Sequence, residues 1–188
     1  MQPLPLVRTA DVAAQPWRNG GGFTRELFAA PAGPDWRVRV SVADVDDDGP
    51  FSSFPGVARW FAVLSGNGVV LDVDGAEHRC RADGEALAFD GGARAACRLI
   101  DGPTRDLNLM LRGVRGAMQR VVARAPWRPG ASACGLYATS TGRAAADGET
   151  SAEAIPAHAL RWWPSAPETI AFDGAGWWLA ADAMGESR

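Results

Sequence analysis

The sequence predicts an all-β fold, because short apolar stretches recur along it with turn residues between them and no helical pattern interrupts them. No window of eleven or more residues shows convincing helical periodicity. Gly, Pro and Asp separate the apolar stretches at the close spacing that is typical of antiparallel strands. With 188 residues, of which 47% are hydrophobic, the chain is long enough for one ordinary domain or for two small barrels that share a core.

Two stretches in the first half alternate between apolar and polar residues, as strands with one buried face do. Over residues 36–45 the even positions 36 to 42 are Trp or Val, and positions 37, 39 and 41 are Arg or Ser. Over residues 106–112 the odd positions are all Leu. Each strand therefore has one face for a core and one face for water or a polar pocket. Further short strands are expected at 60–64, 69–73, 86–89 and 97–100.

The second half is expected to form five more strands, at residues 118–123, 135–139, 158–163, 168–172 and 177–181. The stretch 141–153 is rich in Ala, Gly and acidic residues, and predicts a mobile loop. Paired tryptophans at 162–163 and 177–178 place aromatic rings on both faces of their strands. Those strands are therefore expected to be covered on both sides, by the other half of the chain or by a second subunit.

Composition excludes several classes of partner. The formal net charge is -3, which provides no basic face for nucleic acid, and no apolar run approaches the roughly eighteen residues of a membrane span. The N-terminal stretch has neither a basic start nor an apolar run, so no secretory signal is expected and a cytoplasmic location is predicted.

The side-chain inventory narrows the chemistry. Cys80, Cys97 and Cys134 are odd in number and widely spaced, which favours buried, reduced thiols. The chain has no lysine, so Schiff-base and P-loop lysine chemistry are excluded.

Residues 16–26 contain three consecutive glycines followed by strand-like residues. A phosphate loop needs glycines that open a helix, and here the β-favouring Phe23 and Thr24 follow instead. The segment therefore predicts either a tight turn into a strand or a loop that brings backbone N–H groups close to a ligand.

Residues 60–92 resemble the core of a cupin barrel, but the histidine and glutamate ligands of metal-binding cupins are missing. The only histidines are His78 and His158, far apart in the sequence, so no metal centre and no cofactor are expected. No nucleophile motif of the Gly-x-Ser-x-Gly type occurs either.

Three segments, taken together, resemble the HutD/Ves family. They are Trp-Arg-Asn-Gly-Gly-Gly-Phe-Thr-Arg-Glu at 17–26, Asp-Gly-Pro-Phe-Ser-Ser-Phe-Pro-Gly-Val-Ala-Arg at 48–59, and Asp-Gly-Pro-Thr-Arg-Asp-Leu-Asn-Leu-Met at 101–110. Their order and spacing make the match specific, and it is strongest over residues 16–112. Relatives often carry Asp where this chain has Ala58, so an acid at that position has no role here.

The resemblance implies a bicupin fold without the usual metal-ligand motif, with one cupin-like barrel over residues 1–112 and a second over 113–188. It also implies a place in histidine utilisation. The family is not an established enzyme family, and the role proposed for it is the binding of a pathway intermediate, such as urocanate or formylglutamate, with a regulatory outcome.

From the residues, we expect a small carboxylate to bind at the mouth of the first barrel, because arginine offers a carboxylate two parallel donors. Either Arg59 or Arg25 would take the carboxylate, hydroxyl and amide groups of the polar strand faces would donate to it, and phenylalanines would wall the pocket. The predicted ligand-binding residues are Asn19, Gly21, Gly22, Thr24, Arg25, Ser41, Phe51, Phe54, Arg59 and Asn108.

Two other functions stay open at this point. One is a metal-independent isomerase or epimerase of a small acid, whose general base would be Glu26, His78 or His158. The other is an oligomeric interaction module without a ligand, in which the paired tryptophans and edge strands build the contact. A homodimer through sheet faces fits either the binding protein or the module.

Overall fold

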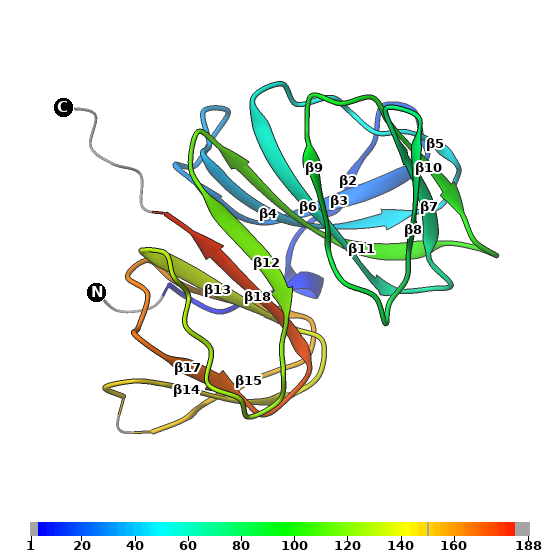
Figure 1. Cartoon of the computed structure of the whole chain (residues 1–188). Coiled ribbons are helices and arrows are strands. Elements are labelled where there is room, and N and C mark those ends of the chain that lie inside the picture. Colours follow the sequence, from blue (N-terminus) through cyan, green and yellow to red (C-terminus); the bar gives the residue numbers. More distant parts are fainter. Residues whose placement is uncertain (1–3, 150, 183–188) are drawn as a thin grey trace. The chain divides into compact units, whose positions relative to one another are not determined.

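The computed structural model describes residues 4–149 and 151–182, and these residues form an all-β structure with a single turn of 3-10 helix (Figure 1). No helix in this part of the chain has the length and apolarity needed to cross a membrane. In chain order the elements are β1 (Val7–Arg8), η1 (Thr9–Asp11), β2 (Gln15–Pro16), β3 (Gly22–Ala30), β4 (Val38–Val45), β5 (Gly49–Pro50), β6 (Val57–Ser65), β7 (Val69–Val73), β8 (Ala76–Cys80), β9 (Leu87–Asp90), β10 (Ala95–Leu99), β11 (Thr104–Arg112), β12 (Gly116–Arg120), β13 (Ala133–Ala138), β14 (Gly142–Ala146), β15 (Glu153–Ile155), β16 (Ala159–Trp163), β17 (Ile170–Phe172) and β18 (Gly176–Ala181).

The chain divides into two compact units, one of which is Val12–Gly113. The other combines the segment up to Asp11 with the chain from Val114 onward. The division after Gly113 lies one residue from the boundary expected from the sequence, but the first residues belong with the second half. The reason is that β1 pairs antiparallel with β16, and the Thr9 hydroxyl lies 3.1 Å from the Tyr137 hydroxyl in a buried hydrogen bond.

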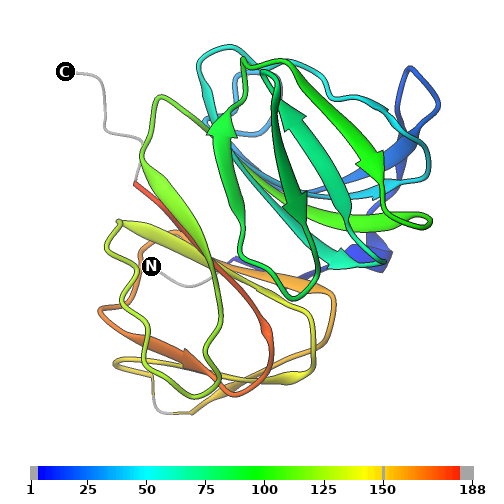
Figure 2. The same ribbon diagram turned by 45° about the vertical axis from the view of Figure 1, so that its right-hand side comes forward.

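The unit of residues 12–113 consists of two sheets that face each other (Figure 2). The larger sheet has the strand order β2-β3-β4-β11-β6-β9, and the smaller one has the order β5-β10-β7-β8. Apolar side chains from β4, β6, β7, β8 and β10 form one buried cluster between the sheets. We call the side of the larger sheet that carries this cluster its inner face.

The register of β4 and β11 brings their polar positions together on the inner face. Asn108 of β11 pairs with Ser41 of β4, and Asp106 pairs with Ala43, which belongs to the buried cluster. The predicted alternation of residues 36–45 and 106–112 is therefore confirmed, and the polar face proves to be the inner one. Side chains that could have met water are instead enclosed within the unit.

A β-bulge in the middle of β3 changes which of its side chains point to the inner face. Glu26 pairs with Ser41 and Phe28 pairs with Val40, so Leu27 is the extra residue on β3. Before the bulge, even-numbered residues such as Thr24 share the inner face, and Arg25 shares the opposite face with Val42. Bulges of this kind change which side chains a strand directs inward.

The other unit also has two sheets, with strand orders β1-β16-β13-β18-β12 and β15-β14-β17. Its main buried cluster is apolar and packs against the stacked rings of Trp127 and Trp178, whose centroids are 4.8 Å apart. All four paired tryptophans are buried, as the sequence predicts for strands covered on both faces.

The loop predicted over residues 141–153 is wrong in its first part, where β14 forms. Ala144 and Ala146 are buried and pair with β17, while Arg143 and Ala145 are exposed. Alanine is a poor indicator of strands, so this alternation is easily missed. The polar run around His78 forms a further strand, β8.

Gly22→Ala is expected to destabilise the protein by about 2 kcal/mol or more, because an added Cβ would overlap the carbonyl oxygen of Asp44 on the neighbouring strand. Gly21→Ala is the matched control, since its nearest non-adjacent atoms would be 3.7 Å away. Urea denaturation of both variants measures the difference. Equal midpoints for the two variants would contradict this close strand packing.

Candidate functional site

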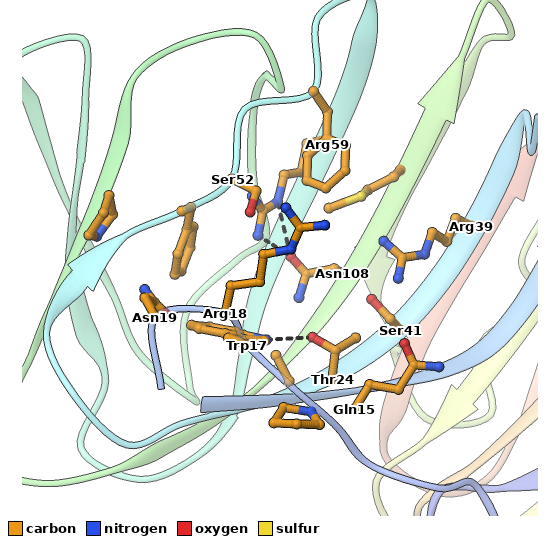
Figure 3. A pocket seen from close by; sticks show the side chains of 16 residues that line it. Gln15, Trp17, Arg18, Asn19, Thr24, Arg39, Ser41, Ser52, Arg59 and Asn108 are labelled. Atoms are coloured by element: carbon orange, nitrogen blue, oxygen red, sulfur yellow. Dashed lines mark hydrogen bonds between the residues drawn. The ribbon is translucent and has the colours of Figure 1, made fainter. Parts of the chain in front are cut away.

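A cavity of about 620 Å³ opens in the unit of residues 12–113 (Figure 3). Its walls come from β2 and the loop after it, from β3, β4, β6 and β11, and from β5 with the loop that follows. The residues that line it are Gln15, Pro16, Trp17, Arg18, Asn19, Thr24, Arg39, Ser41, Ala43, Pro50, Phe51, Ser52, Phe54, Arg59, Asn108 and Met110. Three of these sixteen residues are arginines and none is acidic, so the cavity favours an anion.

Arg59 is the buried cation of the cavity, with only 7% of its surface exposed. Its Nε and Nη2 both donate to Oδ1 of Asn108, at 3.0 and 2.7 Å. The centre of its guanidinium lies 4.7 Å from the ring centroid of Phe51 and 5.3 Å from that of Phe89. A neutral amide and two aromatic rings therefore hold this side chain in place.

The charge of Arg59 has no carboxylate partner. Burial lowers the pKa of Arg59 to about 10, which still leaves it protonated at neutral pH. Within residues 4–149 and 151–182 it forms no ion pair. A buried charge without a partner carries a large desolvation cost, and a bound anion would offset that cost.

Asp106 lies on the same inner face of β11, two residues from Asn108, and is fully buried. Its Oδ2 accepts a hydrogen bond of 3.0 Å from the Thr104 hydroxyl, while its Oδ1 has no hydrogen-bond partner. Burial raises the pKa of Asp106 to about 8, although Thr104 and Arg59 act in the opposite direction. Asp106 is therefore mostly protonated at pH 7, and it does not neutralise Arg59.

The other two arginines of the cavity differ from Arg59. Arg39 is half-buried and its Nε donates to Glu26 at 2.7 Å, so its charge is already compensated. Arg18 is exposed and forms no ion pair with a described residue. The cavity therefore has two arginines without an ion-pair partner among the described residues, the buried Arg59 and the exposed Arg18.

The loop that contains the three consecutive glycines, Gly20 to Gly22, positions the side chains of Trp17 and Asn19. The Gly20 N–H donates to the Trp17 carbonyl at 3.0 Å, with φ of 75° at Gly20. The Gly21 N–H donates to Oδ1 of Asn19 at 3.2 Å. Trp17 Nε1 donates to the Thr24 hydroxyl at 2.7 Å, which fixes the indole against β3 (Figure 3). The backbone donors of Gly20 and Gly21 are therefore used inside the loop.

Seven of the ten residues predicted from the sequence line the cavity: Asn19, Thr24, Ser41, Phe51, Phe54, Arg59 and Asn108. Gly21, Gly22 and Arg25 do not. Arg25 lies on the opposite face of β3, where it pairs with Asp44, and Asp44 also accepts a bond of 2.6 Å from Arg105. Of the two arginines that the sequence leaves open, only Arg59 reaches the cavity.

Sequence reasoning missed several lining residues. Arg18 belongs to the first motif and Ser52 to the second, so motif membership could have identified both. Arg39 shares a strand face with Ser41, and this alternation could have pointed to it. Gln15 carries no signal that would have singled it out.

The residues considered for catalysis or metal binding lie outside the cavity. Glu26, His78 and His158 do not line it. The three cysteines are free and buried, as predicted, and burial raises the pKa of Cys80 to about 11 and those of Cys97 and Cys134 to about 12. In the part of the chain that the structure describes, no group of three His, Cys, Asp or Glu residues could hold a metal ion.

Comparison with known proteins identifies several relatives. The model of the HutD family matches residues 9–180. An uncharacterised 21.2 kDa protein in the hutC 3' region of Pseudomonas putida is 39% identical over 145 residues, which are 75% of this chain and 72% of the relative. Protein Ves of Citrobacter koseri is 37% identical over 99 residues, 51% of either chain.

Solved structures agree with these matches. HutD from Pseudomonas fluorescens SBW25, in a formate condition, superposes with a TM-score of 0.83 at 28% identity, covering 96% of this chain and 99% of that one. A conserved protein of unknown function from Pseudomonas aeruginosa PAO1 reaches 0.84 at 31% identity, covering 95% and 98%. Oxalate decarboxylase of Bacillus subtilis, at 0.66 and 10% identity over 97% and 78%, shows the cupin-like fold alone.

Asp106→Asn is expected to stabilise the protein at neutral and alkaline pH, by about 2 kcal/mol or more at pH 8. The folded state holds the Asp106 proton up to a pKa of about 8, whereas the unfolded chain releases it near the ordinary carboxyl pKa of 3.8. Wild-type stability from this group therefore falls as pH rises from about 4 to about 8, and the advantage of the variant grows over the same range. Urea denaturation from pH 4 to pH 9 measures it. A stability difference that does not change with pH would show that Asp106 titrates normally.

Proposed function

Because the chain belongs to the HutD family, we propose that it binds a small carboxylate, such as urocanate or formylglutamate, in the cavity of residues 12–113 and has a regulatory role in histidine utilisation. The proposal takes the chain to be a bicupin, with two cupin-like barrels that lack the usual metal-ligand motif. It includes a cytoplasmic location, no nucleic-acid or membrane partner, and a homodimer.

The observation that carries the proposal is the buried charge of Arg59. Its guanidinium is held by the Asn108 amide and forms no ion pair with a carboxylate of the described residues. A carboxylate ligand supplies the missing counter-charge and accepts the charge-assisted hydrogen bonds that arginine forms best. The ligand would therefore complete an ion pair for which the protein provides only one partner.

The surroundings of Arg59 favour a small ligand with a planar part. Since Asn108 uses Oδ1 to accept from Arg59, its Nδ2 group is the donor that remains for a ligand, and the Ser41 hydroxyl lies beside it in register. Trp17, Phe51 and Phe54 supply aromatic surface along the wall. Sites that bind small molecules commonly combine such apolar walls with a few placed polar groups.

Binding is favoured over isomerisation by the lining of the cavity. None of the sixteen lining residues is Asp, Glu, His or Cys, whereas proton abstraction needs a base within hydrogen-bond reach. Glu26, the base considered from the sequence, accepts from Arg39. The open volume of the cavity favours a ligand over an interaction module whose barrel is filled by its own side chains.

The link to histidine utilisation rests on the relatives. The matching protein of P. putida is described by its position in the hutC 3' region, and the P. fluorescens structure is HutD itself. These names support placing the carboxylate among the intermediates of that pathway.

Arg59→Ala is expected to weaken the binding of urocanate and formylglutamate by at least about tenfold, because the charge-assisted hydrogen bonds are lost. Arg25→Ala is the matched control and should bind within about twofold of wild type, since Arg25 faces Asp44 and lies outside the cavity. Isothermal titration calorimetry measures all three proteins. No binding by the wild type, or equal binding by Arg59→Ala, would rule out this function.

Arg18→Gln is expected to weaken binding by about threefold and to reduce its dependence on salt, because an exposed edge charge acts mainly by attraction over distance. Arg59→Ala should lose affinity at every salt concentration. Titrations at 20 and 500 mM NaCl compare the two. If Arg18→Gln lost as much affinity as Arg59→Ala and with the same dependence on salt, the assignment of different roles to the exposed Arg18 and the buried Arg59 would be wrong.

A further inference from the structure

Asp106 is a buried acid next to the anion site that does not itself line the cavity. On the inner face of β11 it stands between Thr104, which donates to its Oδ2, and Asn108, which holds Arg59. Its cross-strand partners are Ala43 of β4 and Val63 of β6, neither of which can hydrogen-bond through its side chain. The Oδ1 atom therefore has no partner.

The charged and titratable groups that act on Asp106 are few. Arg59 of β6 attracts the ionised form, and Asp44 of β4 opposes it. Burial raises the pKa of Cys80 of β8 to about 11 and that of Cys97 of β10 to about 12, and Asp106 adds a smaller contribution in the same direction to each.

We infer that Asp106 is a positioning residue whose proton keeps the charge of Arg59 available to the ligand, so that the cavity binds its anion while Asp106 is neutral and releases it when Asp106 ionises. This inference rests on the proposed function of the same cavity.

The physical reason is competition for one cation. An ionised Asp106 and a bound carboxylate would both compensate Arg59, and the two anions would repel each other across a site with little water. Binding of the ligand therefore favours the protonated form of Asp106. By linkage, binding near the pKa of this group draws a proton from solution onto Asp106.

The pKa values of the neighbouring groups lie away from 8, so Asp106 is the group among them that changes charge around pH 8. The pKa values of Cys80, Cys97 and Arg59 lie at about 11, 12 and 10. Hydrogen bonds from Arg105 and Arg25 outweigh the effect of burial on Asp44 and hold its pKa below the ordinary value. Arg39 is compensated by Glu26.

The test is calorimetric titration with formylglutamate, whose carboxylates stay ionised above pH 7. With a pKa of about 8 for Asp106, the wild-type dissociation constant should rise about tenfold between pH 7 and pH 9. Asp106→Asn should bind with dissociation constants that agree within about twofold over this range. Asp44→Asn, which removes an ionised acid outside the cavity, should keep the wild-type dependence on pH.

Proton uptake gives a second readout, which does not depend on any variant. Titrations at pH 8 in two buffers of different ionisation enthalpy should show uptake of about half a proton per formylglutamate bound by the wild type. Asp106→Asn should show none. If that variant fails to fold, wild-type uptake near zero still overturns the inference and uptake near half a proton supports it.

The possible failures can be told apart. Affinity that is constant from pH 7 to pH 9, or the same loss of affinity in Asp106→Asn, overturns the role of Asp106 and leaves the proposed function intact. Absence of binding at pH 7 overturns the proposed function and this inference with it.

Discussion

The guanidinium of Arg59 is a full positive charge inside a β structure, and its neighbours are an amide oxygen, two aromatic rings and an acid that holds its proton. Such a charge is expensive to bury, and proteins usually bury one only with a counter-ion. Here the amide and the rings fix the geometry without cancelling the charge. The remaining features of the cavity can be understood as ways of keeping that charge both ordered and unneutralised.

The fold achieves this through strand register. β4, β11 and β6 lie side by side, and their pairing puts Ser41, Asn108 and the side chain of Arg59 on one face. Further along the same face the residues of β4 and β6 are apolar, join the core cluster and flank Asp106 of β11. The other unit has two sheets as well, yet the hydrophobic cluster of its core consists of apolar and aromatic side chains, and its buried Thr9 hydroxyl is paired with that of Tyr137. The two units therefore have similar sheet architecture but different interiors.

Much of this could be predicted from the sequence, because alternation specifies which residues share a face. The alternation in residues 36–45 and 106–112 placed Ser41 and Asn108 on polar strand faces and among the predicted ligand-binding residues, and the register then made them neighbours. It could not decide between Arg25 and Arg59, since both belong to the family motifs and the sequence does not show which face of its strand each occupies. The bulge at Leu27 and the Asp44 ion pair make that choice, and both depend on contacts distant in sequence. The raised pKa of Asp106 could not be predicted from the sequence either, because it results from the complete burial of the side chain.

The cavity is built from two kinds of structure. Its cation and its amide stand on long central strands of the sheet, whereas its edge consists of the short segments 15–19 and 50–54, most of which lie in loops. Apart from Phe51, whose ring packs on the Arg59 guanidinium, substitutions in those two segments would change the size and chemistry of the ligand body that fits and would leave Arg59 and Asn108 in place. Related proteins with this arrangement can thus diverge in ligand choice while inheriting one unchanged anchor for negative charge.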